Sequence, residues 1–237
     1  MKTVASEILE GLAEFDSATV QNAAAIVYGG YISAHIDYSG PDLKPYLWNQ
    51  DGSGKAVVGY AMTSTWMPIH GIDGRSQEPY GRWEYYDAIA HTDAPTIVVQ
   101  QDIDIPRRRA AILGDEMAHQ MSALGAVGAV VDGNARDIPG INRSGLSLWA
   151  TGRVPGHASF AMIDHGVPVV VAGLRILPGD ILVCDGDGVT RVPVNIAEDV
   201  LKTAAEVRAK EGAGFAYFSK PNFSIEDWET YKASVGS

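Results

Sequence analysis

The segment at residues 114–137 limits the possible folds of this chain more than any other part of it. Residues 114–124 have the pattern of a helix, and residues 126–131 are a run of small and β-branched apolar residues typical of a buried strand. Only Gly125 separates the two, so the helix is expected to lie close to the strand that follows it. This arrangement predicts an α/β fold, in which helices pack against a sheet.

The rest of the chain also mixes helical and strand-like stretches. Apolar spacing predicts helices at 6–13, 17–27, 83–90 and 196–210, the second of them capped by Asp16. Short apolar runs predict strands at 56–65, 96–101, 146–150, 167–172, 180–183 and 189–192, with a tight turn between the last two. We expect irregular structure at 37–54 and 66–81, and the aromatic-rich stretch 215–231 shows no clear periodicity. No repeat or low-complexity linker divides the chain, so one α/β domain over residues 1–237 is expected.

Charge and hydropathy limit the classes of partner. The formal net charge is −11, and such a surface repels nucleic-acid phosphates. The only dense basic run, at residues 107–109, is interpreted as a solvated segment or a contact between subunits. An anionic ligand would need a positive side chain focused within a site. The N-terminus lacks an apolar secretory core, and no stretch reaches the ~20 apolar residues of a membrane span. We therefore expect a cytoplasmic protein that binds neither nucleic acid nor membrane.

Cysteine and histidine give no sign of chemistry. Cys184 is the only cysteine and lies in an apolar run, which favours a buried hydrophobic residue over a nucleophile. The six histidines show no close zinc-binding spacing, and we interpret each as a structural or surface residue.

The start of the helix at 114–124 could bind an anion. Gly114 precedes the helix, and the first backbone amides, near Asp115, Glu116 and Met117, have no partner within the helix. Such amides point along the helix axis toward a bound anion. The helix start is therefore a candidate substrate-binding element.

The end of the strand adds two charged side chains. The strand emerges at Asp132 and Gly133, and Arg136 and Asp137 follow. A guanidinium can bind a substrate carboxylate through two parallel hydrogen bonds. A carboxylate can bind a hard cation such as magnesium, directly or through water. The alternative is that Arg136 and Asp137 form only a surface ion pair.

These residues together resemble the signature of the RraA-like family, which includes divalent-metal-dependent 4-hydroxy-4-methyl-2-oxoglutarate aldolases. The signature has a glycine-led helix start, small residues, Gly-x-x-Gly, a hydrophobic strand, Asp-Gly, two residues and then Arg-Asp. Downstream, residues 167–173, 177–183 and 185–193 are similar, in that order, to the family's V-P-V…G, P-G-D and D-x-D-G-V…V-P motifs. Residues 15–20 are similar to its N-terminal helix entry, so the resemblance spans roughly residues 15 to 210.

The resemblance implies a fold and an assembly. The fold would be an α/β/α sandwich of the swivelling, phosphohistidine-domain type. The chain would assemble as a homotrimer or homohexamer, with its sites between subunits.

The resemblance also implies a lyase. A divalent metal, Mg²⁺ or Mn²⁺, and Arg136 would bind the pyruvate-like half of a small anionic 2-oxo acid and stabilise a pyruvate enolate while the carbon–carbon bond breaks. Asp137 would anchor the metal, and the helix start at Gly114 would bind substrate through the amides of Glu116 and Met117. Oxaloacetate decarboxylation would follow the same chemistry. No lysine lies in the matching segments, which argues against a Schiff-base aldolase.

Two positions depart from the family's pattern. Characterised aldolases have a Glu or Asp where Gly140 stands, with two residues between it and the Arg-Asp pair. Asp115 stands where a small or apolar residue is usual, and it could either replace a metal ligand or repel an anionic substrate.

Two alternatives to the aldolase stay open. One is a regulatory binding protein of the type that inhibits ribonuclease E. The other is a lyase for a different, sugar-acid-like substrate, since the long loops at 37–54 and 66–81 could reshape a pocket.

Overall fold

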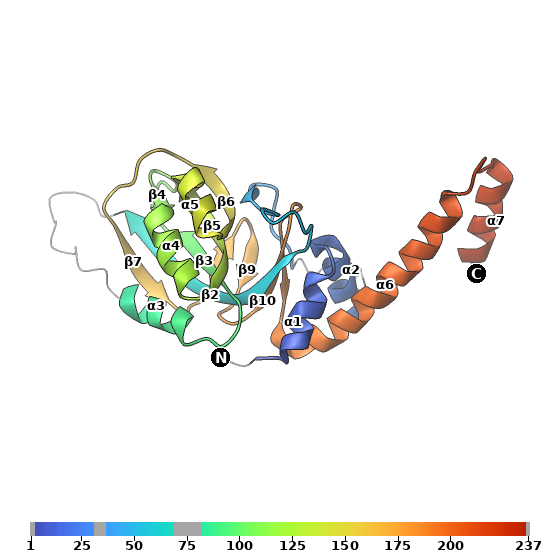
Figure 1. Ribbon diagram of the computed structural model, residues 1–237, viewed down its shortest axis with the longest axis horizontal. Helices are drawn as coiled ribbons and strands as arrows, with labels where there is room; N and C mark the ends of the chain where they lie inside the picture. Colours follow the sequence, from blue (N-terminus) through green and yellow to red (C-terminus); the bar gives the residue numbers. More distant parts are fainter. Residues whose placement is uncertain (1–2, 31–36, 69–81, 236–237) are drawn as a thin grey trace.

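The centre of the molecule is a curved mixed sheet, seen behind the helices in Figure 1. The computed structural model describes residues 3–30, 37–68 and 82–235. Within them, nine strands form one sheet in the order β1-β6-β5-β3-β2-β10-β11, with β4 paired to β5 and β7 paired to β2, while β8 and β9 form a separate hairpin. The strands are β1 (Lys44–Leu47), β2 (Val57–Pro68), β3 (Thr96–Asp102), β4 (Ala111–Leu113), β5 (Ala126–Ala135), β6 (Ser147–Arg153), β7 (Phe160–His165), β8 (Val169–Val171), β9 (Leu174–Ile176), β10 (Ile181–Cys184) and β11 (Val189–Val192).

The middle of the sheet is parallel, and this determines where its strands end. Strands β2, β3, β5 and β6 run side by side in one direction, and β4 joins the last residues of β5 in the same direction. The outer strands β1, β7, β10 and β11 are antiparallel to their neighbours. Because parallel strands end at the same edge, the residues that follow β4, β5 and β6 lie close together there.

Helices cover one face of the sheet in two groups (Figure 1). Helices α3 (Arg82–Ala90), α4 (Asp115–Ala123) and α5 (Ile138–Ser144) lie over the strands that lead to the β4–β6 edge. Helices α1 (Ser6–Ala13) and α2 (Ser17–Val27), with the first turns of α6 (Ala197–Phe218), lie over β2, β10 and β11. The β8–β9 hairpin covers the opposite face. The predicted α/β class is confirmed, and the second face of the sheet is covered by a hairpin.

The C-terminal end of the chain forms an arm that leaves the body of the molecule (Figure 1). Its two helices are the outer part of α6 and α7 (Ile225–Val235). Aromatic rings hold them together: Phe218 and Tyr231 have centroids 4.7 Å apart, and Tyr217 and Tyr231 5.3 Å. The aromatic residues without periodicity thus belong to a helical hairpin, in which α6 is longer than predicted.

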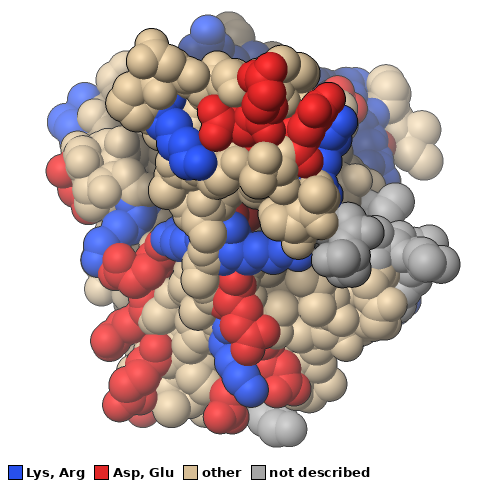
Figure 2. Space-filling view, turned by 90° about the vertical axis from the view of Figure 1, so that its right-hand side faces the viewer, with Lys and Arg blue, Asp and Glu red and all other residues tan. Residues whose placement is uncertain are grey.

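The surface carries charges of both signs. Seen from the side of the arm, acidic and basic side chains are interspersed (Figure 2). No helix in the described ranges is long and apolar enough to cross a membrane.

Several short elements were missed by the sequence patterns. Strand β1 lies within the stretch expected to be irregular, and β4, β7, β9 and α5 were not predicted. Strands β1 and β7 lie at edges: β1 has exposed and half-buried residues, β7 mixes exposed with buried ones, and neither shows a clean alternation. Strand β5 continues to Ala135 instead of ending near Asp132, because β4 and β6 supply hydrogen-bonding partners on both sides. Of the loop expected at 66–81, residues 66–68 belong to β2, and 69–81 lie outside the described residues.

Candidate functional site

The carboxyl edge of β4, β5 and β6 holds the candidate site. Leu113 of β4 is paired with Ala135 of β5, which is paired in turn with Arg153 of β6. The Arg136 amide then donates to the Leu113 carbonyl at 3.0 Å, and the Val154 amide to the Ala135 carbonyl at 3.1 Å. Three strand ends therefore lie side by side, at the edge where parallel sheets commonly bind ligands.

A cavity of about 200 Å³ lies between the start of α4 and Arg136. The backbone of α4 comes close to the Arg-Asp pair at Gly114: a Cβ added there would stand 3.2 Å from Arg136 Nε and 3.5 Å from Asp137 Oδ2. Glycine thus lets the backbone of α4 approach the Arg-Asp pair closely. The cavity is lined by Ala111, Leu113, Gly114, Asp115, Glu116, Met117, Arg136, His157 and Phe160. It brings together every predicted site residue except Asp137.

Asp137 lies beside this cavity and orients Arg136. Arg136 Nε lies 3.0 Å from Asp137 Oδ2 in an ion pair, and the two side chains are 32% and 39% exposed. The ion pair considered as an alternative is therefore present, through Nε of the guanidinium. Asp137 has φ 57°, and this left-handed residue turns the chain from β5 into α5. That turn brings the two charged side chains to the mouth of the cavity.

Asp115 fills the space where a side chain at position 140 would point. A Cβ on Gly140 would stand 2.5 Å from the Asp115 Cβ and 2.8 Å from its Cγ. The carboxylate missing at Gly140 is therefore matched in space by one from α4. Asp115 Oδ1 accepts a hydrogen bond from the Glu116 amide at 2.9 Å, so one amide expected for an anion is already engaged.

His157 is a site residue that the sequence reasoning missed. It follows β6 and is positioned by the Gly156 carbonyl, which accepts from the Ala111 amide at 3.0 Å. Its Nδ1 lies 3.1 Å from the Ala158 carbonyl, which can only accept. We therefore assign the proton to Nδ1, which leaves Nε2 as an acceptor. The ring meets Phe160 edge-on, with centroids 6.4 Å apart. No motif links this histidine to Arg136, because only the β5–β6 pairing brings them together.

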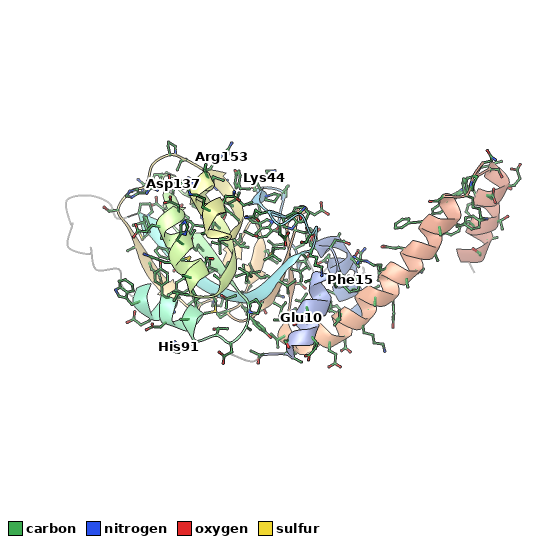
Figure 3. The ribbon with its side chains drawn as sticks, in the orientation of Figure 1. Glu10, Phe15, Lys44, His91, Asp137 and Arg153 are labelled. Carbon is green, nitrogen blue, oxygen red and sulfur yellow. The ribbon has the colours of Figure 1, made fainter. Side chains whose placement is uncertain are left out.

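A second cavity of about 290 Å³ adjoins the first, sharing Arg136 with it. Its lining comes from the ends of β5 and β6: Ala135, Arg136, Asp137, Ile138, Arg153, Val154 and Pro155. Asp137 and Arg153 lie at the same edge of the molecule, whereas His91 lies at the opposite edge (Figure 3). Arg153 is thus a second missed residue.

The donor set fits a hard cation with few protein ligands. The acidic side chains lining the two cavities are Asp115, Glu116 and Asp137. Within the described ranges, no three His, Cys, Asp or Glu side chains are grouped closely enough to enclose a metal. Mg²⁺ typically takes one or two carboxylates, keeps several waters and binds substrate. Asp137, with help from Asp115, could hold such an ion, whereas a closed zinc site lacks the required ligands.

The basic run at 107–109 is anchored by buried carboxylates. Arg107 contacts Asp132 at 2.9 Å, and Arg109 contacts Asp104 at 2.7 Å. Burial raises the pKa of Asp132, and the nearby guanidinium of Arg107 opposes that rise. This run is therefore exposed, as the solvated-segment interpretation expects, and ion pairs tie it to carboxylates near the ends of β3 and β5.

Comparison with protein families gives a match over most of the chain. A model of the RraA-like family, described as Aldolase/RraA, matches residues 20–191. A putative 4-hydroxy-4-methyl-2-oxoglutarate aldolase of Halalkalibacterium halodurans is 35% identical over 104 residues, which cover 44% of this chain and 50% of that protein. A 4-hydroxy-4-methyl-2-oxoglutarate aldolase of Thermus thermophilus is 33% identical over 86 residues, covering 36% and 52%. The chain thus spans about half the length of the curated relatives it matches.

Solved structures give longer matches. An uncharacterized protein from Pseudomonas syringae pv. tomato is similar over 97% of this chain and 96% of its own, with a TM-score of 0.73 and 25% identity. Streptomyces coelicolor RraAS2, an unusual member of the RNase ES inhibitor RraA family, covers 90% of this chain and 98% of its own, with a TM-score of 0.71 and 26% identity.

Proposed function

Because this chain belongs to the RraA-like family, we propose that it is a lyase that cleaves a 4-hydroxy-2-oxo acid to release pyruvate, with Mg²⁺ or Mn²⁺ as cofactor. Relatives named as 4-hydroxy-4-methyl-2-oxoglutarate aldolases indicate aldolase chemistry. The observation that carries the proposal is the placement of Arg136 in a cavity beside the start of α4, with Asp137 at its edge.

Arg136 is the residue proposed to hold the substrate. Its Nε is paired with Asp137, and the residue lines both cavities, so the other N–H groups of the guanidinium would be the ones to bind a substrate carboxylate. A carboxylate bound there would lie near the positive end of α4, where the amides of Asp115 and Met117 add to the attraction. The same positive groups would stabilise negative charge that develops on the 2-oxo group as the bond breaks.

Asp137 and Asp115 are the residues proposed to hold the metal. Both supply hard carboxylate oxygens, and Asp137 is open to solvent, so water and substrate can complete the coordination. When bound, the ion would act as a Lewis acid that polarises the 2-oxo group.

Pyruvate release tests the proposal. The protein is incubated with Mg²⁺ and each of 4-hydroxy-4-methyl-2-oxoglutarate, 4-carboxy-4-hydroxy-2-oxoadipate and oxaloacetate, and pyruvate is measured with lactate dehydrogenase. We expect release above a protein-free blank from at least one substrate, its loss in excess EDTA and its return with added Mg²⁺. Failure with all three substrates would refute the aldolase, and activity that persists in EDTA would refute the metal.

A regulatory role is the second candidate, favoured by the similarity to RraAS2 over 90% of this chain. Such a protein would bind ribonuclease E and inhibit RNA cleavage without turnover of a 2-oxo acid. An RNA-cleavage assay with ribonuclease E separates the two functions, since the aldolase proposal expects no inhibition.

A further inference from the structure

We propose that Arg153 binds the second carboxylate of a dicarboxylic 2-oxo acid, so that the site selects dianionic over monoanionic substrates. This inference rests on the proposed function, because it assigns the first carboxylate to Arg136. It assigns a residue to the recognition of the second carboxylate, a role that neither the family match nor the names of the relatives give to any residue.

The strand register positions Arg153. It is paired with Ala135, the residue before Arg136, on neighbouring parallel strands. Paired residues in a sheet point to the same face, and Ala135 packs in the core beneath α4 and α5. Arg153 therefore leaves the sheet on the α4–α5 side, where it lines the second cavity with Arg136 and Asp137.

The aromatic ring of Tyr46 supports Arg153. The guanidinium carbon lies 5.5 Å from the centroid of that ring, on the neighbouring strand β1. A cation over an aromatic face is attracted by the ring's quadrupole, and this contact leaves the hydrogen-bond donors of the guanidinium available.

Arg153 differs from most arginines of this acidic chain in its lack of an ion-pair partner among the described residues. Arg107, Arg108, Arg109, Arg136, Arg191 and Arg208 each lie within ion-pair distance of a carboxylate. For Arg153, no such carboxylate lies within the described ranges. An exposed cation at the mouth of a cavity, in a chain of net charge −11, is suited to an anionic ligand.

The spacing suits a short dicarboxylic acid. Neighbouring strands are ~4.8 Å apart, and Arg153 on β6 is paired with the residue just before Arg136 at the end of β5. Because Arg136 borders both cavities, a ligand with one carboxylate on Arg136 can extend its second toward Arg153. A monoanion of the same length would leave Arg153 in water.

Calorimetric titration with two unreactive 2-oxo acids tests this selection. 2-Oxoglutarate and 2-oxopentanoate have the same number of carbons, but only the first has a second carboxylate. With Mg²⁺ present, the wild type is expected to bind 2-oxoglutarate more tightly. Arg153→Gln is expected to weaken 2-oxoglutarate binding about ten- to 150-fold, the usual range for a hydrogen bond to a charged group, and to leave 2-oxopentanoate binding unchanged. Arg153→Lys should restore part of the preference.

Arg143→Gln is the matched control. Arg143 is on α5, donates to the Pro139 carbonyl and lines neither cavity, so Arg143→Gln makes the same change in net charge outside both cavities. Equal binding of both acids by the wild type, no binding of either, or equal weakening of both by Arg153→Gln would overturn the proposal. The two proposals can fail separately. If binding is selective and depends on Arg153 but no hydroxylated substrate releases pyruvate, the aldolase proposal is refuted and the dicarboxylate site is supported.

Discussion

Replacing Gly140 by alanine tests whether Asp115 occupies the place of the missing carboxylate. In an ordinary helix this change stabilises by about 1 kcal/mol, because glycine is the more flexible residue. Here the new Cβ would stand 2.5 Å from the Asp115 Cβ, about 1 Å closer than the ~3.5 Å of carbon atoms in contact. The Asp115 Cβ is fixed by its backbone, so rotating the side chain cannot relieve the overlap, and α4 and α5 must separate. We expect a net loss of roughly 1–3 kcal/mol in the free energy of unfolding, typical of overpacking.

Thermal unfolding of two alanine variants measures this difference. Gly212, in the exposed part of α6, has no atom within 4 Å of an added Cβ, so Gly212→Ala should leave stability unchanged or raise it. For a chain of this size, about 1 kcal/mol shifts the Tm by roughly 2–4 °C, so Gly140→Ala should lower the Tm by about 2–12 °C. A Gly140→Ala protein as stable as Gly212→Ala would show that Asp115 does not fill this space.

Three further predictions concern the metal, the cysteine and the assembly. Asp137→Asn should weaken Mn²⁺ binding, measured by electron paramagnetic resonance of the free ion, and unchanged binding would place the metal elsewhere. Burial raises the pKa of the Cys184 thiol, so the native protein should not react with a thiol reagent until it is denatured; rapid labelling would contradict its burial. We expect a homotrimer or homohexamer by light scattering, because Phe215 (65% exposed) and Trp228 (40%) leave aromatic surface on the arm. Serine at both positions should reduce the assembled mass if the arm joins subunits, and a wild-type monomer at micromolar concentration would refute the assembly.

The sequence predicts those parts of the fold that depend on local patterns. The start of α4 and the strand before Arg136 could be predicted, because a glycine-led helix, an apolar run and a polar exit follow one another within a single segment. Helix α5 was missed because Pro139 and Gly140 follow its first residue, and both are unusual in short helices. Proline is tolerated there only because it lies in the first turn.

The parts of the site that sequence patterns missed depend on strand register. Arg153 and His157 reach the site only because β6 runs parallel to β5. The relation between Asp115 and Gly140 depends on the close approach of α4 and α5, which no spacing along the chain reveals. The sequence therefore identifies the central pair, whereas the surrounding side chains require the three-dimensional structure.

The rate of pyruvate release by Arg136→Lys, measured beside the wild type with Mg²⁺, tests the central claim most directly. Lysine keeps the positive charge but loses the paired hydrogen bonds to a carboxylate and the contact from Nε to Asp137. We predict a loss on the order of 100-fold or more in rate, while Arg143→Lys, on the surface of α5, keeps the wild-type rate. Equal rates for wild type and Arg136→Lys would contradict the account and place the chemistry on another residue.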